Sequence, residues 1–196
     1  MNDTSYVTNT HNGHEFVDLG LPSRTLWATC NVGATSPEQA GLYFAFGETT
    51  GYSAEQVKKG ERSFDSASYT APSVSDNLNL EQDAAHVHMG GKWRMPTKAE
   101  CQELIDNTTQ TWTNDYNGTG IKGCVFTSKV NGNSVFLPAA GLYYGSSVRS
   151  VGSYGGYWST SWYSSSSAWE CRVSSGRQDL YRGGRFFGQS VRGVCE

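Results

Sequence analysis

The chain has 196 residues, of which 17% are charged and 13% aromatic, and its formal net charge is −3. This length suits one domain with its own core, and the aromatic content argues against disorder. A weakly negative charge and the lack of any run of 18 apolar residues argue against a nucleic-acid-binding protein and against a membrane-spanning helix.

The N-terminus is polar, and residues 1–13 are predicted to be a flexible arm. It lacks the basic and then apolar pattern of a secretory signal peptide. Residues 14–196 contain no internal repeat and no linker, so they are expected to form a single domain.

Apolar alternation predicts strands over residues 15–21 and 26–32. The segment Ser36–Glu38 places a serine N-cap, a proline and an acid in sequence, which predicts a short helix ending at Gly41. Residues 42–47 are apolar enough for a buried strand or turn.

No periodic pattern is present from residue 49 to residue 80, which indicates a long surface excursion. Thr97 and Glu100 then form a T-x-x-E capping box after a proline. A helix is expected from there to about Asn107, with Cys101, Leu104 and Ile105 facing inward.

Two apolar segments, residues 124–126 and 135–137, flank Asn131-Gly132, a signal for a β-hairpin. A last strand is expected over residues 189–194. Two short helices, several short antiparallel strands and long loops predict the α+β class.

Five cysteines are present, none of them in CxxC spacing, so a zinc ribbon is not expected. Two disulfides at most could form, but buried free thiols are the preferred interpretation. His86-x-His88 would place two imidazoles on one side of a strand as a metal pair, although a structural hydrogen-bonding role is favoured for His86.

The C-terminal quarter differs in composition from the rest of the chain. From Gly141 to Glu196 there is no Lys, Asn, His, Ile or Met, while Ser, Tyr, Gly, Trp and Arg accumulate. This part carries six arginines against three acids, a net charge of +3, which leaves −6 for the remainder. Tyr and Trp with Arg, Ser and Gly are typical of antibody paratopes, so residues 141–187 are predicted to be a recognition surface; ordinary Ser/Gly-rich β-structure is the alternative.

We expect the binding residues to lie on one strand and three loops. On a strand over residues 169–175, alternation groups Trp169 with Cys171 and Val173, expected inward, and Glu170 with Arg172 and Ser174, expected toward the ligand. The full set of ligand-binding candidates is Tyr144, Ser146, Ser147, Arg149, Ser153 and Tyr154 on one loop, Trp162, Tyr163, Ser165 and Ser167 on a second, Arg172 and Ser174 on the strand, and Arg177, Asp179, Tyr181 and Arg182 on a third loop. Trp158, Ser159, Ser190, Val191 and Arg192 are expected to belong to the scaffold.

Signals for catalysis are weak. The chain contains no G-x-S-x-G, P-loop or H-E-x-x-H motif, no carboxylate pair that can be assigned to glycosidase chemistry, and no E-P-N or Q-P-D tripeptide for calcium-dependent sugar binding. No catalytic residue, cofactor or metal is therefore expected.

Several blocks resemble a known family. GGKWRMPTKAECQELID (residues 90–106) resembles the GG-x-WR-[LM]-P-T-x-x-E-[FW] signature shared by formylglycine-generating enzymes of the C-type lectin fold and by the Fibrobacter succinogenes major paralogous domain. The second group is the better match, through FVDLGLPSRTLWATCNVGATSPEQAGLYFAFGETT, DAAHVHMGGKWRMPT, NSVFLPAAG, GGYWSTS and SVRGV. Cys101 replaces a usual aromatic, and Gly193 a frequent proline.

The resemblance implies a C-type lectin-like fold over residues 14–196 and a function as a variable target protein of a diversity-generating retroelement in gut Bacteroides or its phage. Such elements rewrite adenines, so that AAC codons yield Ser, Tyr, Gly, Arg, Asp, Cys or Phe. Trp158, Trp162, Trp169 and Glu170 are not reachable from AAC, which leaves scaffold or other codons as their origin.

The implied partner is a protein or glycan on a cell surface, met outside the cell on a bacterial surface or a virion tail, with no nucleic acid and no membrane insertion. A homotrimer or phage-tail attachment would multiply weak sites by avidity. The alternatives are a non-diversified extracellular adhesin or structural domain, and an oxidoreductase of the formylglycine-generating type. That enzyme type uses a close cysteine pair for copper, whereas Cys171 and Cys195 are 24 residues apart.

Overall fold

The computed structural model describes residues 9–196. In that range the α-helices are α1 (Ala54–Lys58), α2 (Ala84–Met89) and α3 (Lys98–Asn107), with 3₁₀ turns at Leu80–Gln82 and Tyr116–Gly118. The strands are β1 (Thr10–His11), β2 (His14–Asp18), β3 (Leu26–Asn31), β4 (Thr108–Thr113), β5 (Gly123–Ser128), β6 (Ser134–Pro138), β7 (Leu142–Tyr144), β8 (Ser147–Arg149), β9 (Tyr154–Trp162), β10 (Ser167–Ser174), β11 (Arg177–Gly184) and β12 (Arg192–Cys195).

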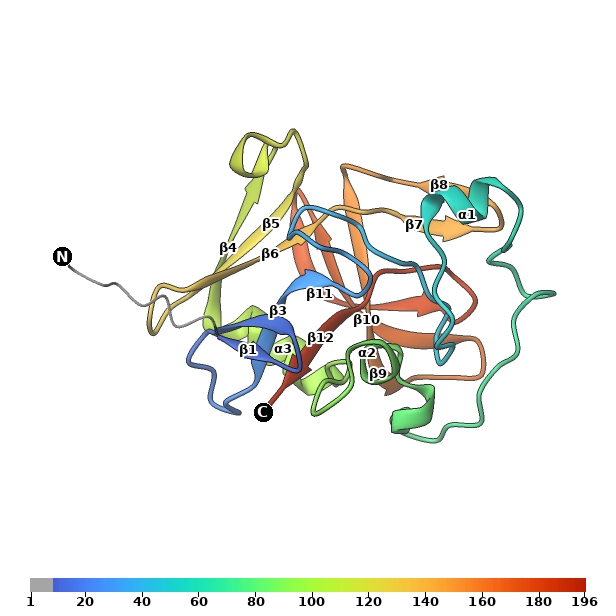
Figure 1. Ribbon diagram of the computed structural model, residues 1–196, viewed down its shortest axis with the longest axis horizontal. Helices are drawn as coiled ribbons and strands as arrows, with labels where there is room; N and C mark the ends of the chain where they lie inside the picture. The colour runs from blue at the N-terminus through green and yellow to red at the C-terminus, as the bar shows by residue number, and fades with distance from the viewer. Residues whose placement is uncertain (1–8) are drawn as a thin grey trace.

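The strands form sheets of order β1-β2-β3-β12, β11-β10-β9 and β4-β5-β6 and a hairpin of β7 and β8, and all these pairings are antiparallel. Few helices and many antiparallel strands agree with the α+β class. β12 pairs with β3, so both ends of the described chain meet in one sheet. Figure 1 shows the β4-β5-β6 sheet on one side of the molecule and the β7–β8 hairpin beside α1 on the other, with the β9-β10-β11 sheet between them.

The predicted capping box starts α3. The Thr97 hydroxyl accepts a hydrogen bond from the Glu100 amide at 3.3 Å, and the Glu100 carboxylate accepts one from the Thr97 amide at 2.8 Å. Arg94 binds the same carboxylate with both terminal nitrogens, at 2.6 and 2.8 Å. Cys101 and Leu104 are buried as predicted, and α3 packs against β10 and β11. The sequence therefore placed this helix correctly because its start is encoded by side chains that are neighbours in the chain.

A buried carboxylate fixes α2. Asp83 caps the helix by accepting the His86 amide at 3.0 Å, and both its oxygens accept the Met95 amide at 3.0 and 2.8 Å. Burial raises the pKa of this carboxyl above its usual value. The cap makes residues 84–89 helical, so the expected strand at His86-x-His88 is wrong.

The two histidines consequently do not share a side. Residues two apart on a helix point about 200° from each other. The His86 ring lies 3.0 Å from the Trp93 carbonyl and the His88 ring 2.8 Å from the Thr49 carbonyl. His86 thus has the structural hydrogen-bonding role that was favoured for it.

Three other local predictions are corrected. No helix forms over residues 36–41, because the few residues between Pro37 and Gly41 make too few hydrogen bonds to offset the cost of helix nucleation. The Gln39 side-chain oxygen instead accepts from the amide and hydroxyl of Thr35. The excursion over residues 49–80 contains α1, which starts at a capping box on Ser53. The described residues therefore hold three α-helices where two were expected.

A flexible arm was expected over residues 1–13, and residues 1–8 of it lie outside the described residues. Its last part is not an arm, because Thr10 pairs with Glu15 and the His11 carbonyl accepts the Trp93 indole N–H at 2.8 Å. These contacts add β1 to the edge of the first sheet.

The strand predictions hold best where the residues are apolar. The strand expected over residues 26–32 is β3, and the predicted hairpin is β5 and β6, with Val125 opposite Phe136. The strand expected over residues 15–21 is shorter, and the last strand begins only at Arg192. Residues 189 and 190 make isolated bridges to Phe44 and Tyr157 instead.

Four of the cysteines are buried free thiols, as expected: Cys101, Cys124, Cys171 and Cys195. Cys30 is a free thiol that is partly exposed. Burial raises the pKa of the Cys124 thiol to about 12. None of the helices within residues 9–196 is both long and apolar enough to cross a membrane.

Arg192 joins three strands at the centre of the molecule. Its side chain is 1% exposed and donates to the Asn31 side-chain oxygen and to the carbonyls of Ala28, Thr29 and Phe136, all at 2.8–2.9 Å. It thereby connects β12 to β3 and to β6. Desolvation lowers the pKa of this guanidinium.

We expect Arg192→Leu to lower the free energy of unfolding by about 2–4 kcal/mol, because four oxygen acceptors lose their charged donor. The loss is not larger because the variant no longer has to bury a cation. Urea unfolding monitored by circular dichroism measures the change. Lys58→Met, at an exposed position on α1, should stay within about 0.5 kcal/mol of the native chain. Equal stability of the two variants would contradict this role for Arg192.

Candidate functional site

Strand β10 positions the centre of the predicted site. Cys171 and Val173 are buried against the α3 side, while Arg172 and Ser174 point to the opposite face of the sheet, as alternation predicted. We call that opposite face of β9, β10 and β11 the outer face.

Two residues of this strand depart from the prediction. Trp169 shares the α3 side with Cys171 but lies at its open end and is partly exposed, so it is not core. Glu170 was expected to face the ligand and is fully buried. Glu170 stays on the outer face, opposite Tyr181 of β11, and is buried there because Tyr154 and Gln189 cover its carboxylate, which the alternation of residue types cannot show.

The outer face carries a charged and aromatic cluster, the sheet cluster. Arg172 makes two bonds of 2.7 Å to the carboxylate of Asp179 directly opposite on β11. Its guanidinium also lies 4.2 Å from the ring centre of Tyr181, which is 47% exposed. Arg177 adds a longer contact of 3.5 Å to Asp179. The arginine is therefore neutralised and oriented before any ligand arrives.

A buried polar network lies next to this cluster on the same face of the sheet. The Tyr154 hydroxyl and the Gln189 side-chain amide both donate to the Glu170 carboxylate. Desolvation raises the pKa of Glu170 above the usual 4.5, against the lowering effect of these two donors. The Gln189 side-chain oxygen is buried without a hydrogen-bond partner among the described residues. Only a glycine fits at Gly183, where an added Cβ would lie 2.2 Å from the Glu170 carboxylate.

A second group, the hairpin cluster, lies on β7 and β8. Tyr144 is 44% exposed, its ring contacts Phe186 and Phe187 with centres 5.9 and 5.6 Å away, and Arg149 lies over it at 4.5 Å. The segment was expected to be a loop. It is a hairpin because Tyr144 pairs with Ser147 and Leu142 with Arg149.

A third group lies on the α3 side of the β9-β10-β11 sheet. Arg182 donates to the Tyr163 hydroxyl at 2.6 Å, and Tyr163 meets Trp169 edge-on with ring centres 5.3 Å apart. Lys98, from the start of α3, lies 3.9 Å from the Trp169 ring centre. We call these four residues the α3-face cluster.

The expected third loop is thus wrong, since residues 177–184 form β11. Consecutive strand residues point to opposite faces, so Tyr181 lies on the outer face and Arg182 on the other. The predicted binding residues consequently do not form one surface. The sheet cluster and the α3-face cluster are separated by the sheet itself.

Every predicted binding residue retains some exposure. Those classed as exposed are Tyr144, Ser146, Ser147, Arg149, Ser153, Tyr163, Ser165, Arg177, Tyr181 and Arg182, and those half-buried are Tyr154, Trp162, Ser167, Arg172, Ser174 and Asp179. Trp162 ends β9 and packs on a core cluster, which leaves it the weakest candidate. The expected scaffold residues Trp158, Ser159, Ser190, Val191 and Arg192 are all buried, as predicted.

Several neighbours of these groups are not among the predicted binding residues. Phe186 and Phe187 lay inside the segment singled out by composition and could have been found from it. Lys98 and Gln189 carry no such signal, because only the folded chain brings them to Trp169 and Glu170.

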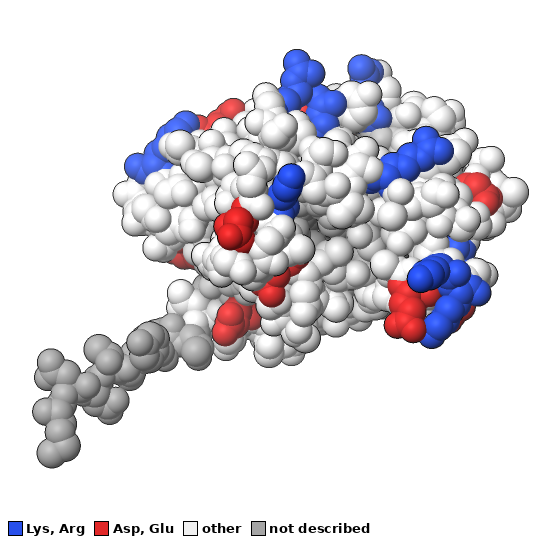
Figure 2. Space-filling model, turned by 90° about the horizontal axis from the view of Figure 1, so that it is seen from above, with Lys and Arg blue, Asp and Glu red and all other residues white. Residues whose placement is uncertain are grey.

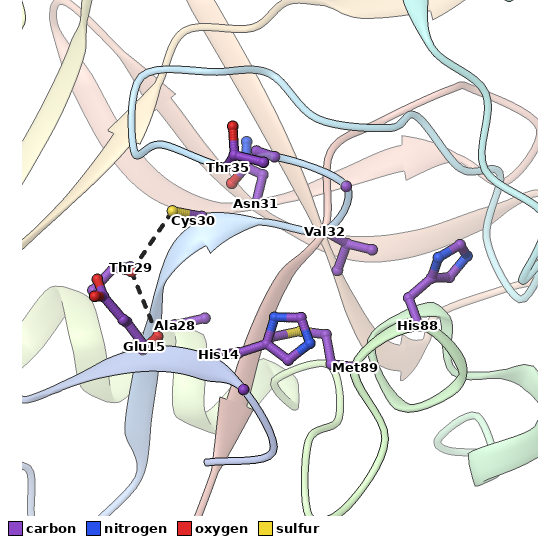
Figure 3. Close-up of a pocket in the computed structure, with 13 residues that line it drawn as sticks. His14, Glu15, Ala28, Thr29, Cys30, Asn31, Val32, Thr35, His88 and Met89 are labelled. Atoms are coloured by element: carbon purple, nitrogen blue, oxygen red, sulfur yellow. Dashed lines mark hydrogen bonds between the residues drawn. The ribbon is translucent and has the colours of Figure 1, made fainter. Parts of the chain in front are cut away.

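A pocket of about 560 Å³ opens elsewhere, between β2, β3 and the end of α2 (Figure 3), and no predicted binding residue lines it. The partly exposed Cys30 thiol lies 3.6 Å from the Thr29 hydroxyl there. His14 and His88 also line the pocket. No sequence pattern predicts this cavity, because segments distant in the chain form it.

Charges are sparse on the surface. Figure 2 shows Lys and Arg spaced among uncharged residues, with no continuous basic area on the face drawn. Within residues 9–196 no three His, Cys, Asp or Glu side chains gather in a way that could hold a metal ion.

Glu170→Gln tests the buried carboxylate. A raised pKa means that the fold favours the protonated form, so the stabilising contribution of Glu170 is complete below its ordinary pKa of 4.5 and is lost as the pH rises through the folded-state value. The glutamine variant stays neutral. We expect its stability relative to the native chain to improve as the pH rises above the ordinary glutamate pKa of 4.5, because only the native chain then has to bury a charge or stay protonated against the solvent. Urea unfolding across this range measures the slope, and a flat or declining difference would contradict the expectation.

No protein-family model, curated protein or solved structure matches this chain. Its function is therefore inferred from its own residues and their geometry.

Proposed function

We propose that this chain is a C-type lectin-like recognition domain that binds a protein or glycan on a cell surface without covalent chemistry, through the sheet cluster and the hairpin cluster. We propose further that it is a variable protein diversified by a retroelement and related to the Fibrobacter succinogenes major paralogous domain. The observation that carries the proposal is the exposure of Tyr144, Arg149 and Tyr181 together with the partial exposure of Arg172.

The distribution of residue types supports diversification. The exposed Tyr, Ser and Arg side chains of both clusters belong to the set that adenine rewriting of AAC codons yields. Of the four residues that this route cannot produce, Trp158 and Glu170 are fully buried, whereas Trp162 and Trp169 are partly exposed. Rewriting confined to exposed positions would leave the core unchanged.

The backbone beneath these side chains is held independently of them. β9, β10 and β11 pair along their lengths by main-chain hydrogen bonds, and Trp158 anchors β9 by donating its indole N–H to the Phe44 carbonyl at 2.8 Å. Outward side chains on such strands can change while the ladder stays intact. This property is what a diversified binding face requires.

The clusters also have the chemistry of binding hot spots. Arg172 over Tyr181 and Arg149 over Tyr144 are rigid pairs that present aromatic area and guanidinium donors together. Tyr and Arg at the centre of an interface commonly contribute about 2 kcal/mol or more each when buried by a partner.

The two alternatives receive less support. A non-diversified adhesin or structural domain would use the same exposed residues, and only variability separates it from the proposal. An oxidoreductase of the formylglycine-generating type would need a close cysteine pair that substrate can reach. Cys171 and Cys195 belong to different core clusters, and the pair that does lie in contact, Cys101 and Cys171, is fully buried. We propose that the protein acts outside the cell, on a bacterial surface or a virion tail. A homotrimer or tail attachment would supply avidity.

Replacing Tyr144, Arg172 and Tyr181 together by alanine should abolish binding while the fold persists. The measurement is flow cytometry of the labelled chain on a panel of bacterial cells, with the thermal transition of each variant recorded in parallel. We expect at least about a thirtyfold loss of affinity for any strain that the native chain binds.

Alanine at Lys58 and Val87, both exposed on other elements, is the matched control and should bind like the native chain. Unfolding of the triple variant would assign these residues to the core, and unchanged binding would place the recognition face elsewhere.

The DNA around the coding sequence tests diversification separately. We expect a near-copy of the 3′ end of the gene, with mismatches confined to adenines, beside a reverse transcriptase gene. Sequencing of that region in several isolates checks this, and identical 3′ ends without such a copy would favour the non-diversified adhesin.

A further inference from the structure

The α3-face cluster is a second surface with a chemistry of its own. Lys98 and Arg182 flank one indole, since their charged groups lie 3.9 and 5.9 Å from the ring centre of Trp169. Tyr163, 42% exposed, closes the group by its edge-on contact with Trp169 and its bond to Arg182. Two cations and two aromatic rings are therefore held together at one end of the sheet.

These two cations have no carboxylate partner among residues 9–196, unlike the arginine of the sheet cluster. Arg172 is neutralised by Asp179, whereas neither Lys98 nor Arg182 makes an ion pair. The acid closest to Lys98 along the chain, Glu100, is already bound by Arg94. An anion placed beside Trp169 would meet two positive charges without displacing an internal partner.

The loop next to the cluster is rich in hydroxyl groups. Residues 163–166 join β9 to β10, and the Ser164 hydroxyl accepts the amides of Ser166 and Ser167 at 3.3 and 3.1 Å, which orders the turn. Ser165 and Ser166 remain exposed. The loop beside the cluster therefore offers small hydroxyl side chains to a ligand.

We propose that the α3-face cluster binds an acidic carbohydrate, with a uronate carboxylate beside Lys98 and Arg182 and a sugar ring against the exposed edges of Trp169 and Tyr163. Charge complementarity selects an anion, the aromatic rings suit the apolar face of a sugar, and the serine hydroxyls can exchange hydrogen bonds with sugar hydroxyls. A nucleic acid would need a longer basic surface than the two cations of this cluster provide, and the net charge of the chain is −3.

This site is separate from the proposed recognition face. Arg182 and Tyr181 are neighbours in β11 but point to opposite sides of the sheet, so a ligand can occupy one cluster without touching the other. Failure of either proposal leaves the other unaffected.

Calorimetric titration of the full chain with hexagalacturonate tests the site, with maltohexaose as a neutral hexasaccharide, a heparin hexasaccharide as a sulfated one and a poly-glutamate peptide as a non-sugar anion. We expect hexagalacturonate to bind, to weaken as salt is raised, and to bind at least about tenfold more tightly than maltohexaose and poly-glutamate. Equal binding of maltohexaose or of poly-glutamate would overturn the proposal, as would no binding of hexagalacturonate. Tighter binding of the heparin oligosaccharide would also overturn it, by making sulfate the preferred anion.

The variant Lys98→Gln/Arg182→Gln should lose affinity for hexagalacturonate at least about tenfold with an unchanged thermal transition. Lys58→Gln/Arg24→Gln removes the same charge from two exposed positions outside all three clusters and should bind like the native chain. Equal losses in the two double variants would show a non-specific charge effect and overturn the site. If the first variant does not fold, the comparison of the four ligands on the native chain decides.

Discussion

The architecture depends on one buried cation. Arg192 reaches from β12 to backbone carbonyls of β3 and β6, and no carboxylate takes part in these bonds. Burying a guanidinium is costly unless its donors are satisfied, so the surrounding carbonyls must be held in place by the sheets that contain them. The last strand, the first sheet and the β4-β5-β6 sheet are thereby fixed to one another, which gives the β9-β10-β11 sheet a rigid support.

On that support, three tasks are divided among the residues of β10. Cys171 and Val173 pack toward α3, Arg172 presents its charge on the outer face, and Glu170 lies on that same face under Tyr154 and Gln189. This buried network lies beside the sheet cluster, so its hydrogen bonds set the position of the strand without using any exposed side chain. A surface of this kind can accept many substitutions, which is the property that the proposed function requires.

The two faces of the sheet offer different electrostatics. On the outer face Arg172 is compensated by Asp179, so recognition there would rely on shape, aromatic area and directed hydrogen bonds. On the α3 side Lys98 and Arg182 are uncompensated and favour an anion. One short strand, β11, supplies residues to both, because neighbouring residues on a strand point in opposite directions.

Features encoded by close neighbours in the chain were determined by the sequence alone: the capped helix at Thr97, the hairpin around Asn131-Gly132, and the composition that singled out residues 141–187. The tertiary structure alone decided what depends on distant partners. Trp169 lies outside the core, where it contacts Lys98 and Tyr163 at the edge of the sheet. The predicted binding residues lie on both faces of the sheet because β11 is a strand and not a loop. Local hydrogen bonds can be predicted from spacing, whereas contacts between residues far apart in the chain arise only when the sheets pack.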